Sequence, residues 1–370
     1  MNIAIITPDF SSNCLGRSYL LAQLLQRYHR VSIIGPIFKN EVWFPLAKVR
    51  DVPFLPIQTP LNLTQFILRI NRIIKKIKGE VIYITKPLIT SYGPALIAKK
   101  KFKLPLILDI DDWEMAPFKE KNILQKYLQA LYHINNPFSF FPCAVMDKYI
   151  ARADLITVSS NSLKKMYGGL VVPHLRKIIP PKPGMKSSKK TVLFLGTPRP
   201  HKGLKELIEA FKLIPYNNVV LQIVGFNKKS AYCQELKASA KRDKRIQFQD
   251  QVRFDKIPEY MAGADIVVIP QKYTSCGQTQ LPAKLFDAMA SGRAIIATRV
   301  SDIPEIIGDA GVIVEPNNTA ELKNAMISLL DSPERIRELG EKAKERYRKF
   351  YSFDKMSQKL NDYILSNLNV

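Results

Sequence analysis

Short apolar runs that alternate with helix-like patterns constrain the fold more than any other feature of the sequence. In the first half the runs fall at 3–7, 31–34, 81–85, 106–110, 155–158 and 170–172, with helical patterns such as 18–28 between them. In the second half they fall at 191–196, 219–224, 246–249, 266–270, 294–298 and 312–314. Strands that alternate with helices form parallel sheets, because a parallel connection needs a long crossover. The sequence therefore predicts an α/β protein with two doubly wound, Rossmann-like domains.

The length and one proline-rich segment indicate where the domains divide. A chain of 370 residues with 46% apolar residues is long enough for two domains, each with its own core. The segment PHLRKIIPPKPGMKSSKK, residues 173–190, has four prolines and no acid, which is typical of an interdomain linker. We expect an N-terminal domain over 1–173, a linker over 174–190, a second domain over 191–350 and a final helix over 351–370. No apolar run is long enough to predict a transmembrane helix.

Charge and cysteine usage restrict the partners. The net charge is +24, and residues 1–184 hold 26 Lys and Arg against 11 Asp and Glu. Such an excess favours a polyanionic partner: anionic lipid, nucleic acid or a phosphorylated substrate. No recognition motif with interleaved aromatic residues accompanies the charge, so we expect no nucleic-acid partner. Cys14, Cys143, Cys233 and Cys276 are scattered, which indicates reduced thiols in a cytoplasmic protein, and the apolar N-terminus lacks the basic start of a signal peptide.

The segment SCGQTQLPAKLFDAMASGRAIIAT, residues 275–298, carries the most specific local pattern. It predicts a loop that holds Gly277, a helix over 282–290 and a strand over 294–298, with Pro at the start of the helix and Gly just past its end. The free N–H groups of the first helical turn favour an anion beside Gln280 and Leu281. Asp287, one and a half turns further on, is placed to accept hydrogen bonds from sugar hydroxyls.

This segment resembles the donor-site signature of the family-4 glycosyltransferases of the GT-B fold, the glycosyl transferases group 1. In that family a Glu-x7-Glu pattern precedes an Ala-Met-Ala/Cys-x-Gly-x-Pro run. Asp287 stands at the second Glu and Thr279 at the first, so one acid is shortened and the other is missing. The resemblance extends from about residue 191 to the C-terminus. It implies two domains that face each other across a cleft, a last helix that returns to the first domain, and a donor site formed by Gly277, Gln278, Thr279, Gln280, Leu281 and Asp287.

A second predicted anion site lies in TPRPHKG, residues 197–203, between a strand and a helix over 204–213. The family commonly has Gly-Arg-Leu-x-x-x-Lys-Gly here, where the Arg and the Lys hold the donor diphosphate. Lys202 matches that Lys, and Arg199 is the nearest guanidinium, two residues out of register. An ion pair with a surface carboxylate is the alternative role for Arg199.

The acids in DIDDWE, residues 109–114, come at the end of a predicted buried strand. Acids in this position are poor choices for stability, so their presence indicates a functional role. Asp111 and Asp112 are the candidate catalytic residues: the family often has His-Asp near the acceptor hydroxyl, and Asp111 replaces the His. A structural network of acids that caps the next helix is the alternative. An Asp-x-Asp pattern can bind a divalent metal, but the cationic donor site makes a metal unnecessary, so we expect none. Gly16, expected in the loop after the first strand, is the candidate acceptor-side loop residue.

Two segments are candidates for contact with a membrane. Residues 64–78, TQFILRINRIIKKIK, predict a helix with one apolar face and basic residues on the rest of its surface. Helices at a membrane interface have this pattern, and so does a helix that covers a sheet. Residues 132–149 hold three phenylalanines between prolines and fit either a membrane- or acceptor-binding loop or a buried connection. We therefore expect a cytoplasmic protein that is peripheral at the inner face of the membrane.

Taken with the resemblance, these features predict a retaining, metal-independent hexosyltransferase. It would move a sugar from a nucleotide-diphosphate sugar to an acceptor hydroxyl of a lipid-linked or envelope polysaccharide precursor. Retention rests on the resemblance alone. The alternatives are a nucleotide-sugar epimerase, for which acid and base residues on both faces of the sugar are not evident, and a degenerate protein that binds a sugar nucleotide or nucleic acid without catalysis. The sugar, the base, the acceptor and the oligomeric state stay open.

Overall fold

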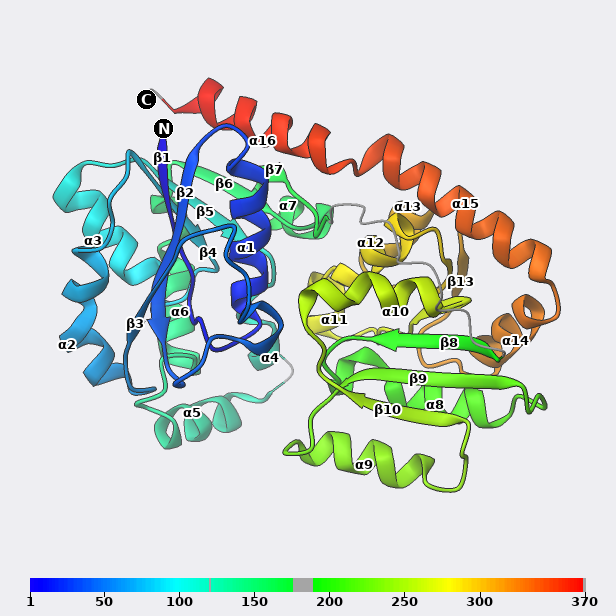
Figure 1. Ribbon diagram of the computed structural model, residues 1–370. Coiled ribbons are helices and arrows are strands. Elements are labelled where there is room, and N and C mark those ends of the chain that lie inside the picture. Colours follow the sequence, from blue (N-terminus) through cyan, green and yellow to red (C-terminus); the bar gives the residue numbers. More distant parts are fainter. Residues whose placement is uncertain (120, 176–188, 369–370) are drawn as a thin grey trace. The chain divides into compact units, whose positions relative to one another are not determined.

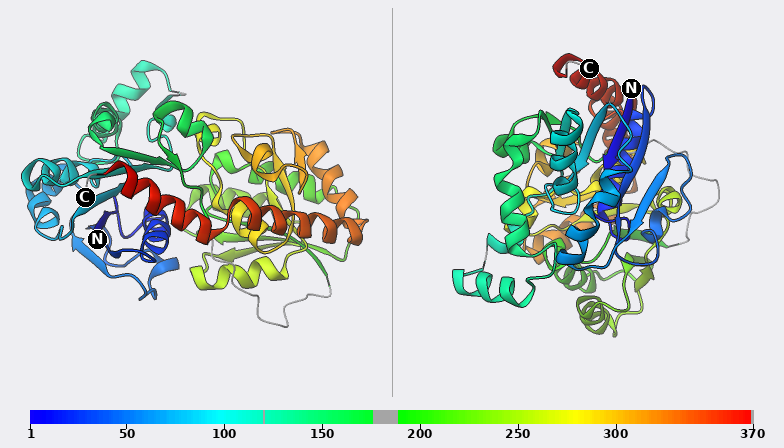
Figure 2. Two further views of the ribbon diagram at one scale, coloured as in Figure 1. Left: turned by 90° about the horizontal axis from the view of Figure 1, so that it is seen from above. Right: turned by 90° about the vertical axis from the view of Figure 1, so that its left-hand side faces the viewer.

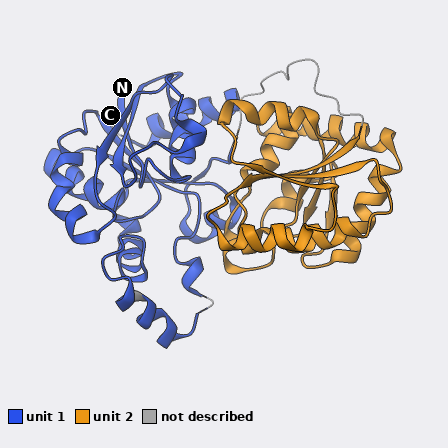
Figure 3. Ribbon diagram, turned by 60° about the horizontal axis from the view of Figure 1, so that its bottom comes forward, with its two compact units in different colours: residues 1–174, 353–370 blue, residues 175–352 orange. Residues whose placement is uncertain are grey.

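The computed structural model describes residues 1–119, 121–175 and 189–368 (Figure 1). The chain forms two compact units: unit 1 contains Met1–His174 and Phe353–Val370, and unit 2 contains Leu175–Ser352 (Figure 3). Most of the predicted linker, residues 176–188, lies outside the described residues. Both ends of the chain belong to unit 1 (Figure 2).

Unit 1 is built on a parallel sheet whose strands follow the order β3-β2-β1-β4-β5-β6-β7. These strands are β1 (Asn2–Ile6), β2 (Arg30–Ile37), β3 (Phe54–Gln58), β4 (Val81–Thr85), β5 (Leu106–Ile110), β6 (Leu155–Val158) and β7 (Leu170–Val171). The sequence pattern misses β3, because this edge strand contains Pro56 and buries none of its five residues, so it shows no apolar run. The strand order reverses between the neighbours β1 and β4.

The helices of unit 1 correct two predictions. They are α1 (Cys14–Leu25), α2 (Leu63–Ile74), α3 (Tyr92–Phe102), α4 (Ala116–Lys119), α5 (Ile123–Tyr132), α6 (Phe140–Lys148), α7 (Asn161–Tyr167) and α16 (Phe353–Asn367), with 3-10 turns η1 (Phe44–Leu46) and η2 (Ile150–Arg152). Gly16 lies in the first turn of α1, not in a loop, because the helix begins four residues earlier than the apolar pattern indicates. The segment 132–149 is largely helical, since α6 tolerates Pro142 in its first turn.

Helices α2 and α16 cover unit 1. Phe66, Ile73 and Ile74 of α2 are buried in the core against the sheet, so the sheet-covering interpretation of this helix is correct. Helix α16 packs on α1, as the predicted fold requires. Ser357 donates a hydrogen bond from its hydroxyl to the carbonyl oxygen of Leu24 in α1. The C-terminal helix is therefore an integral part of the N-terminal domain.

Unit 2 repeats the same topology with six parallel strands in the order β10-β9-β8-β11-β12-β13. The strands are β8 (Lys190–Leu195), β9 (Val219–Phe226), β10 (Ile246–Asp250), β11 (Ile266–Ile269), β12 (Ala294–Thr298) and β13 (Val312–Val314). The helices are α8 (Leu204–Lys212), α9 (Ala231–Ala240), α10 (Ile257–Gly263), α11 (Ser275–Thr279), α12 (Ala283–Ala290), α13 (Ile303–Ile307), α14 (Thr319–Leu330) and α15 (Pro333–Phe350), with 3-10 turns η3 (Pro200–Lys202) and η4 (Phe254–Lys256). Gly277 lies within α11 rather than in a loop, because the side chain of Thr274 caps a short helix there.

Each sheet has one point where the strand order reverses, and in such sheets ligands bind beyond the carboxyl ends of the strands at that point. In unit 2 this point lies between β8 and β11, so the loops that matter are those after these two strands. In unit 1 it lies between β1 and β4, with β5 next to β4. Among the described residues, no helix combines the length and the apolar character needed to cross a bilayer.

Candidate functional site

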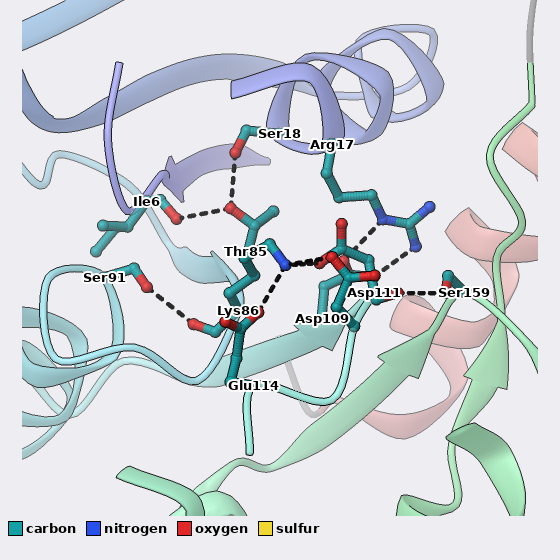
Figure 4. Close-up of polar contacts among 11 residues, drawn as sticks. Ile6, Arg17, Ser18, Thr85, Lys86, Ser91, Asp109, Asp111, Glu114 and Ser159 are labelled. Atoms are coloured by element: carbon teal, nitrogen blue, oxygen red, sulfur yellow. Dashed lines mark hydrogen bonds and ion pairs between the residues drawn. The ribbon is translucent and has the colours of Figure 1, made fainter. Parts of the chain in front are cut away.

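A buried ion pair lies next to the candidate acids of unit 1 (Figure 4). The guanidinium of Arg17, on α1, donates two hydrogen bonds to the carboxylate of Asp109, on β5, at 2.8 and 2.7 Å. Thr157 of β6 donates a third hydrogen bond to Asp109 at 2.8 Å and is itself paired with the hydroxyl of Tyr83. Because Asp109 is fully buried and its oxygens are occupied, it is a structural residue that fixes α1 to the sheet.

Lys86 forms ion pairs with the acids that follow β5. Its Nζ lies 3.1 Å from an oxygen of Asp111, 2.8 Å from Asp112 and 2.6 Å from Glu114. Lys86 follows β4 and has a φ of 66°, an unusual value for a residue with a side chain. Ser91 donates a hydrogen bond to the carbonyl oxygen of Lys86 at 2.8 Å and so holds this turn in place. Asp111 and Asp112 thus lie around a cation that the sequence pattern did not indicate, and their catalytic role stays a prediction.

Burial and charge perturb the pKa values in this cluster. Burial raises the pKa of Asp111 to about 7, against the lowering effect of Lys86, with Asp112 and Asp109 raising it further. Burial also raises the pKa of Glu114. For Lys86 burial acts in the opposite sense, but Asp111, Asp112 and Glu114 hold its pKa well above the ordinary value. Three carboxylates around one ammonium form a site that can hold a proton near neutral pH.

The pKa of Asp111 predicts a pH-dependent stability. Folding raises this pKa from 3.8 to about 7, so between these values the folded state keeps a proton that the unfolded chain has released. Stability should therefore fall as the pH rises through this window, by at most about 1.4 kcal/mol per pH unit. We expect wild type to lose stability relative to Asp111→Asn when thermal unfolding is followed from about pH 4 to pH 7. The exposed Asp354→Asn serves as the control, and a constant difference between wild type and Asp111→Asn would disprove the assignment.

Two other residues near this cluster have structural explanations. A Cβ on Gly16 would lie 3.3 Å from the ring of Trp43, so a tight packing contact accounts for this glycine. The pKa of the Cys14 thiol is raised to about 12, chiefly by burial, which leaves it protonated and a poor nucleophile. All four cysteines are free.

In unit 2, Gln271 shapes the loop that follows β11. Its side-chain amide donates hydrogen bonds to the carbonyl oxygens of Gly277, at 2.6 Å, and Gln280, at 2.8 Å. The hydroxyl of Thr274 accepts a hydrogen bond from the backbone N–H of Gly277 at 3.0 Å. A Cβ on Gly277 would come within 2.1 Å of the carbonyl oxygen of Lys272, so only glycine fits there. Gly277 therefore has a steric role: it lets helix α11 pack closely on the backbone at Lys272.

The loops after β8 and β11 meet at Gln280. Lys202 donates a hydrogen bond from its Nζ to the side-chain oxygen of Gln280, and the ring nitrogen Nε2 of His201 lies 3.2 Å from the same oxygen. The backbone N–H of Lys272 donates to the carbonyl oxygen of His201 at 2.8 Å. Two candidate donor-binding residues, Lys202 and Gln280, are thus brought into contact across 78 residues of sequence.

Gly203 allows this approach. Its φ is 66°, and a Cβ there would lie 1.8 Å from the carbonyl oxygen of Pro270. Since β8 and β11 are neighbours, the turn after β8 has to pass close to the chain that leaves β11. A side chain at this position would force the two loops apart.

The remaining candidates of unit 2 differ in their surroundings. Asp287 is 4% exposed, and the Nζ of Lys284 lies 3.4 Å from one of its carboxylate oxygens. Leu281 is buried, which makes its side chain a packing residue. Thr279 donates its hydroxyl hydrogen to the carbonyl oxygen of Ser275 at 2.9 Å, so this side chain is turned onto its own helix.

Among the candidates of unit 2, Arg199 is exposed. The guanidinium of Arg199 is open to solvent, and both of its predicted roles, binding a diphosphate and pairing with a surface carboxylate, stay predictions. Gln278 is half-buried on α11.

Sequence reasoning missed several polar residues at both switch points. Lys86 follows β4, and Gln271 and Lys272 follow β11, just as Asp111 follows β5. The signal was therefore present: a charged or amide side chain within three residues of the end of a buried strand. His201 and Lys284 lie beside residues that were identified and carried no separate signal.

The whole chain resembles solved two-domain structures. Sucrose-phosphate synthase from Thermosynechococcus elongatus superposes with a TM-score of 0.76 at 16% identity, over 99% of this chain and 98% of that one. Anabaena Alr3699/HepE, solved in complex with UDP and glucose, gives a TM-score of 0.75 at 16% identity, over 99% and 100% of the two chains. Together with the two doubly wound units, these similarities define the GT-B fold.

The second half of the chain is similar in sequence to a known family. Residues 176–346 match the model of the glycosyl transferases group 1. The N-acetyl-alpha-D-glucosaminyl L-malate synthase of Bacillus anthracis is 30% identical over 183 residues, 47% of this chain and 45% of that protein. The MMP alpha-(1->4)-mannosyltransferase of Mycolicibacterium hassiacum is 27% identical over 228 residues, 57% and 54% of the two chains. The chain spans about half the length of these curated relatives.

Proposed function

We propose that this protein is a glycosyltransferase that takes a sugar from a nucleotide-diphosphate donor. The observation that carries the proposal is the convergence of Lys202 and His201 on Gln280 at the switch point of unit 2, with the exposed Arg199 in the same loop. Helix α12 begins three residues after Gln280, so its free N–H groups add positive potential there. Cationic side chains and a helix N-terminus together suit a diphosphate.

The relatives support the same class of donor. HepE of Anabaena was solved with UDP and glucose, and one curated relative is a mannosyltransferase. We extend to this chain the hexose that both descriptions share and the nucleoside diphosphate of the first.

In the proposed reaction, a hydroxyl of the acceptor attacks the anomeric carbon of the sugar while the bond to the diphosphate breaks. Negative charge grows on the departing phosphate oxygen, and Lys202 and Arg199 stabilise that charge. The leaving phosphate accepts the proton of the attacking hydroxyl, so the new bond forms on the same face and the configuration is retained. Asp287 binds sugar hydroxyls, and Asp111 with Asp112 accepts hydrogen bonds from the acceptor.

The position of Lys86 supports a mechanism without a metal ion. The carboxylate oxygens of Asp111, Asp112 and Glu114 lie within 4.8 Å of one another and would suit a cation. They already contact the Nζ of Lys86, so a divalent ion at the same oxygens would be repelled by the ammonium. In unit 2 the positive charge that a metal would supply comes from side chains.

The acceptor is proposed from the surface charge. A strongly basic protein is attracted to anionic envelope components, and a lipid-linked or polysaccharide precursor offers both hydroxyls and negative charge. We place the protein at the cytoplasmic face of the membrane, where such precursors and nucleotide sugars meet.

A thermal-shift panel of UDP, GDP, ADP, TDP and CMP, with and without Mg²⁺, tests the donor site. We expect one diphosphate to stabilise the protein without metal, by about 2.7 kcal/mol at 100 times its dissociation constant. Sugar nucleotides of that base should then release the diphosphate when an acceptor is present. Absence of binding to every nucleotide would refute the donor site. Binding without transfer would instead identify a sugar-nucleotide-binding protein, which the self-bonded Thr279 at the position of the missing Glu would explain.

A further inference from the structure

Helix α5 of unit 1 turns an apolar stripe toward solvent. Its apolar residues recur at 123, 124, 127, 128, 131 and 132, the spacing of one helical face. Five of them are more than half exposed: Ile123 (73%), Leu124 (67%), Leu128 (58%), Leu131 (60%) and Tyr132 (85%). We name these five residues the α5 face. Contiguous exposed apolar surface of this kind marks an interaction site, because a soluble protein gains nothing from leaving it in water.

The helix is anchored to unit 1 through Tyr127, which belongs to the same apolar stripe as the five exposed residues. The ring of Tyr127 lies 6.3 Å from that of Phe140 and 5.9 Å from that of Phe141, both on α6. After the helix, the carbonyl oxygen of Asn135 accepts a hydrogen bond from the backbone N–H of Leu63, at the start of α2, at 2.6 Å. In Figures 1 and 2 the helix stands away from the sheet that α2 and α3 cover. The α5 face is therefore held in a fixed place without being packed on the core.

Basic residues surround this face, and acids are absent from it. Residues 121–146 contain Lys121 and Lys126 and no Asp or Glu. The hydrogen bond from Leu63 brings in α2, where Ile67 and Leu68 are exposed beside the exposed cations Arg72, Lys75 and Lys76. Residues 52–79 also contain no acid. Two lysines in residues 121–146 and the cations at the C-terminal end of α2 thus accompany exposed apolar side chains, and neither segment contains a carboxylate.

We propose that the α5 face docks on an anionic lipid bilayer, with the edge of α2 as a second contact. An amphipathic helix of this composition buries its apolar face at the boundary of headgroups and acyl chains, while lysines and arginines attract anionic headgroups. Charge argues against a second copy as the occupant, because two chains of net charge +24 would meet with like-charged surfaces. The inference stands independently of the proposed reaction, since it rests on the surface of unit 1 alone.

Flotation of the full chain with vesicles tests the proposal. The vesicles are phosphatidylcholine alone or phosphatidylcholine with phosphatidylglycerol, and the double variant Leu124→Glu/Leu128→Glu is compared with Leu213→Glu. Leu213 is a matched control, because it is 61% exposed but belongs to unit 2. Wild type and Leu213→Glu should bind the anionic vesicles, whereas the double variant should bind at least about tenfold more weakly. Lys121→Gln and Lys126→Gln should each weaken binding by about fivefold.

Three outcomes would overturn the proposal. Wild type that stays unbound to anionic vesicles, or binds neutral vesicles equally well, contradicts the assigned lipid. Equal binding by wild type and the double variant shows that another surface is responsible. A dimer in sedimentation equilibrium that dissociates in Leu124→Glu/Leu128→Glu identifies a second copy as the occupant. Circular dichroism and a melting curve establish that each variant is folded, which exposed positions should permit.

Discussion

Replacing Lys202 by alanine should lower the turnover of the donor by at least about 100-fold, the typical effect of removing one group that stabilises a developing oxyanion. Lys202 is half-buried, and its ammonium is held at Gln280, in the loop that follows the neighbouring strand. A charge fixed in this way needs no reorganisation when the bond to the diphosphate breaks. The loss should appear in kcat as well as in kcat/KM, because the interaction strengthens in the transition state.

The matched control is Lys205→Ala. Lys205 lies three residues further on, is exposed, and pairs with Glu235 on α9. The variant Lys205→Ala removes the same charge from the same segment without touching the loop at Gln280. Its turnover should therefore stay within about twofold of wild type. Release of nucleoside diphosphate from the sugar nucleotide, measured as an initial rate, gives the comparison. Equal rates for Lys202→Ala and wild type would place the donor diphosphate elsewhere.

Replacing Arg17 by alanine should destabilise the protein by about 3–5 kcal/mol, the cost of breaking a buried ion pair. Asp109 is fully buried, and its carboxylate would lose both of the hydrogen bonds that Arg17 donates. The hydroxyl of Thr157 alone cannot compensate for a buried negative charge. Urea unfolding followed by far-UV circular dichroism measures the loss in the transition that belongs to unit 1.

Two further variants test whether the loss of stability comes from the unpaired buried charge of Asp109 or from removing an arginine in general. Arg27→Ala breaks an exposed pair between Arg27, two residues after the end of α1, and Asp354 on α16, and should cost less than about 1 kcal/mol. The double variant Arg17→Met/Asp109→Leu removes both charges and should recover much of the stability that Arg17→Ala loses. A loss in Arg17→Ala no larger than that in Arg27→Ala would show that the buried pair contributes little.

The strands of both sheets were predictable because a parallel strand buried on both faces leaves a continuous apolar run. Strands β4, β5, β6, β12 and β13 begin and end where the apolar runs do. Edge strand β3 was missed because it buries no residue. Helix α6 was also missed, since its proline and its two phenylalanines gave no helical period. These errors share a cause: the pattern weakens where an element is not buried on a regular face.

The candidate site was predictable only in part. Lys202, Gln280, Asp111 and Asp112 follow buried strands or begin helices, and those positions can be identified one strand at a time. That Lys202 meets Gln280, and that Lys86 meets the acids, depends on which strands are neighbours. The φ of Lys86 is set by that turn and leaves no trace in the local pattern.

The sequence by itself determined the fold class and the kinds of side chain at the ends of the strands. The reason is that the burial of each helix and strand fixes the spacing of its apolar residues along the chain. Only the tertiary structure decided which helices bury their apolar faces. Helices α2 and α5 are both amphipathic, yet α2 buries Phe66, Ile73 and Ile74 while the α5 face stays exposed. A helical period records that a helix has an apolar side, but what lies against that side is fixed by residues far away in the chain.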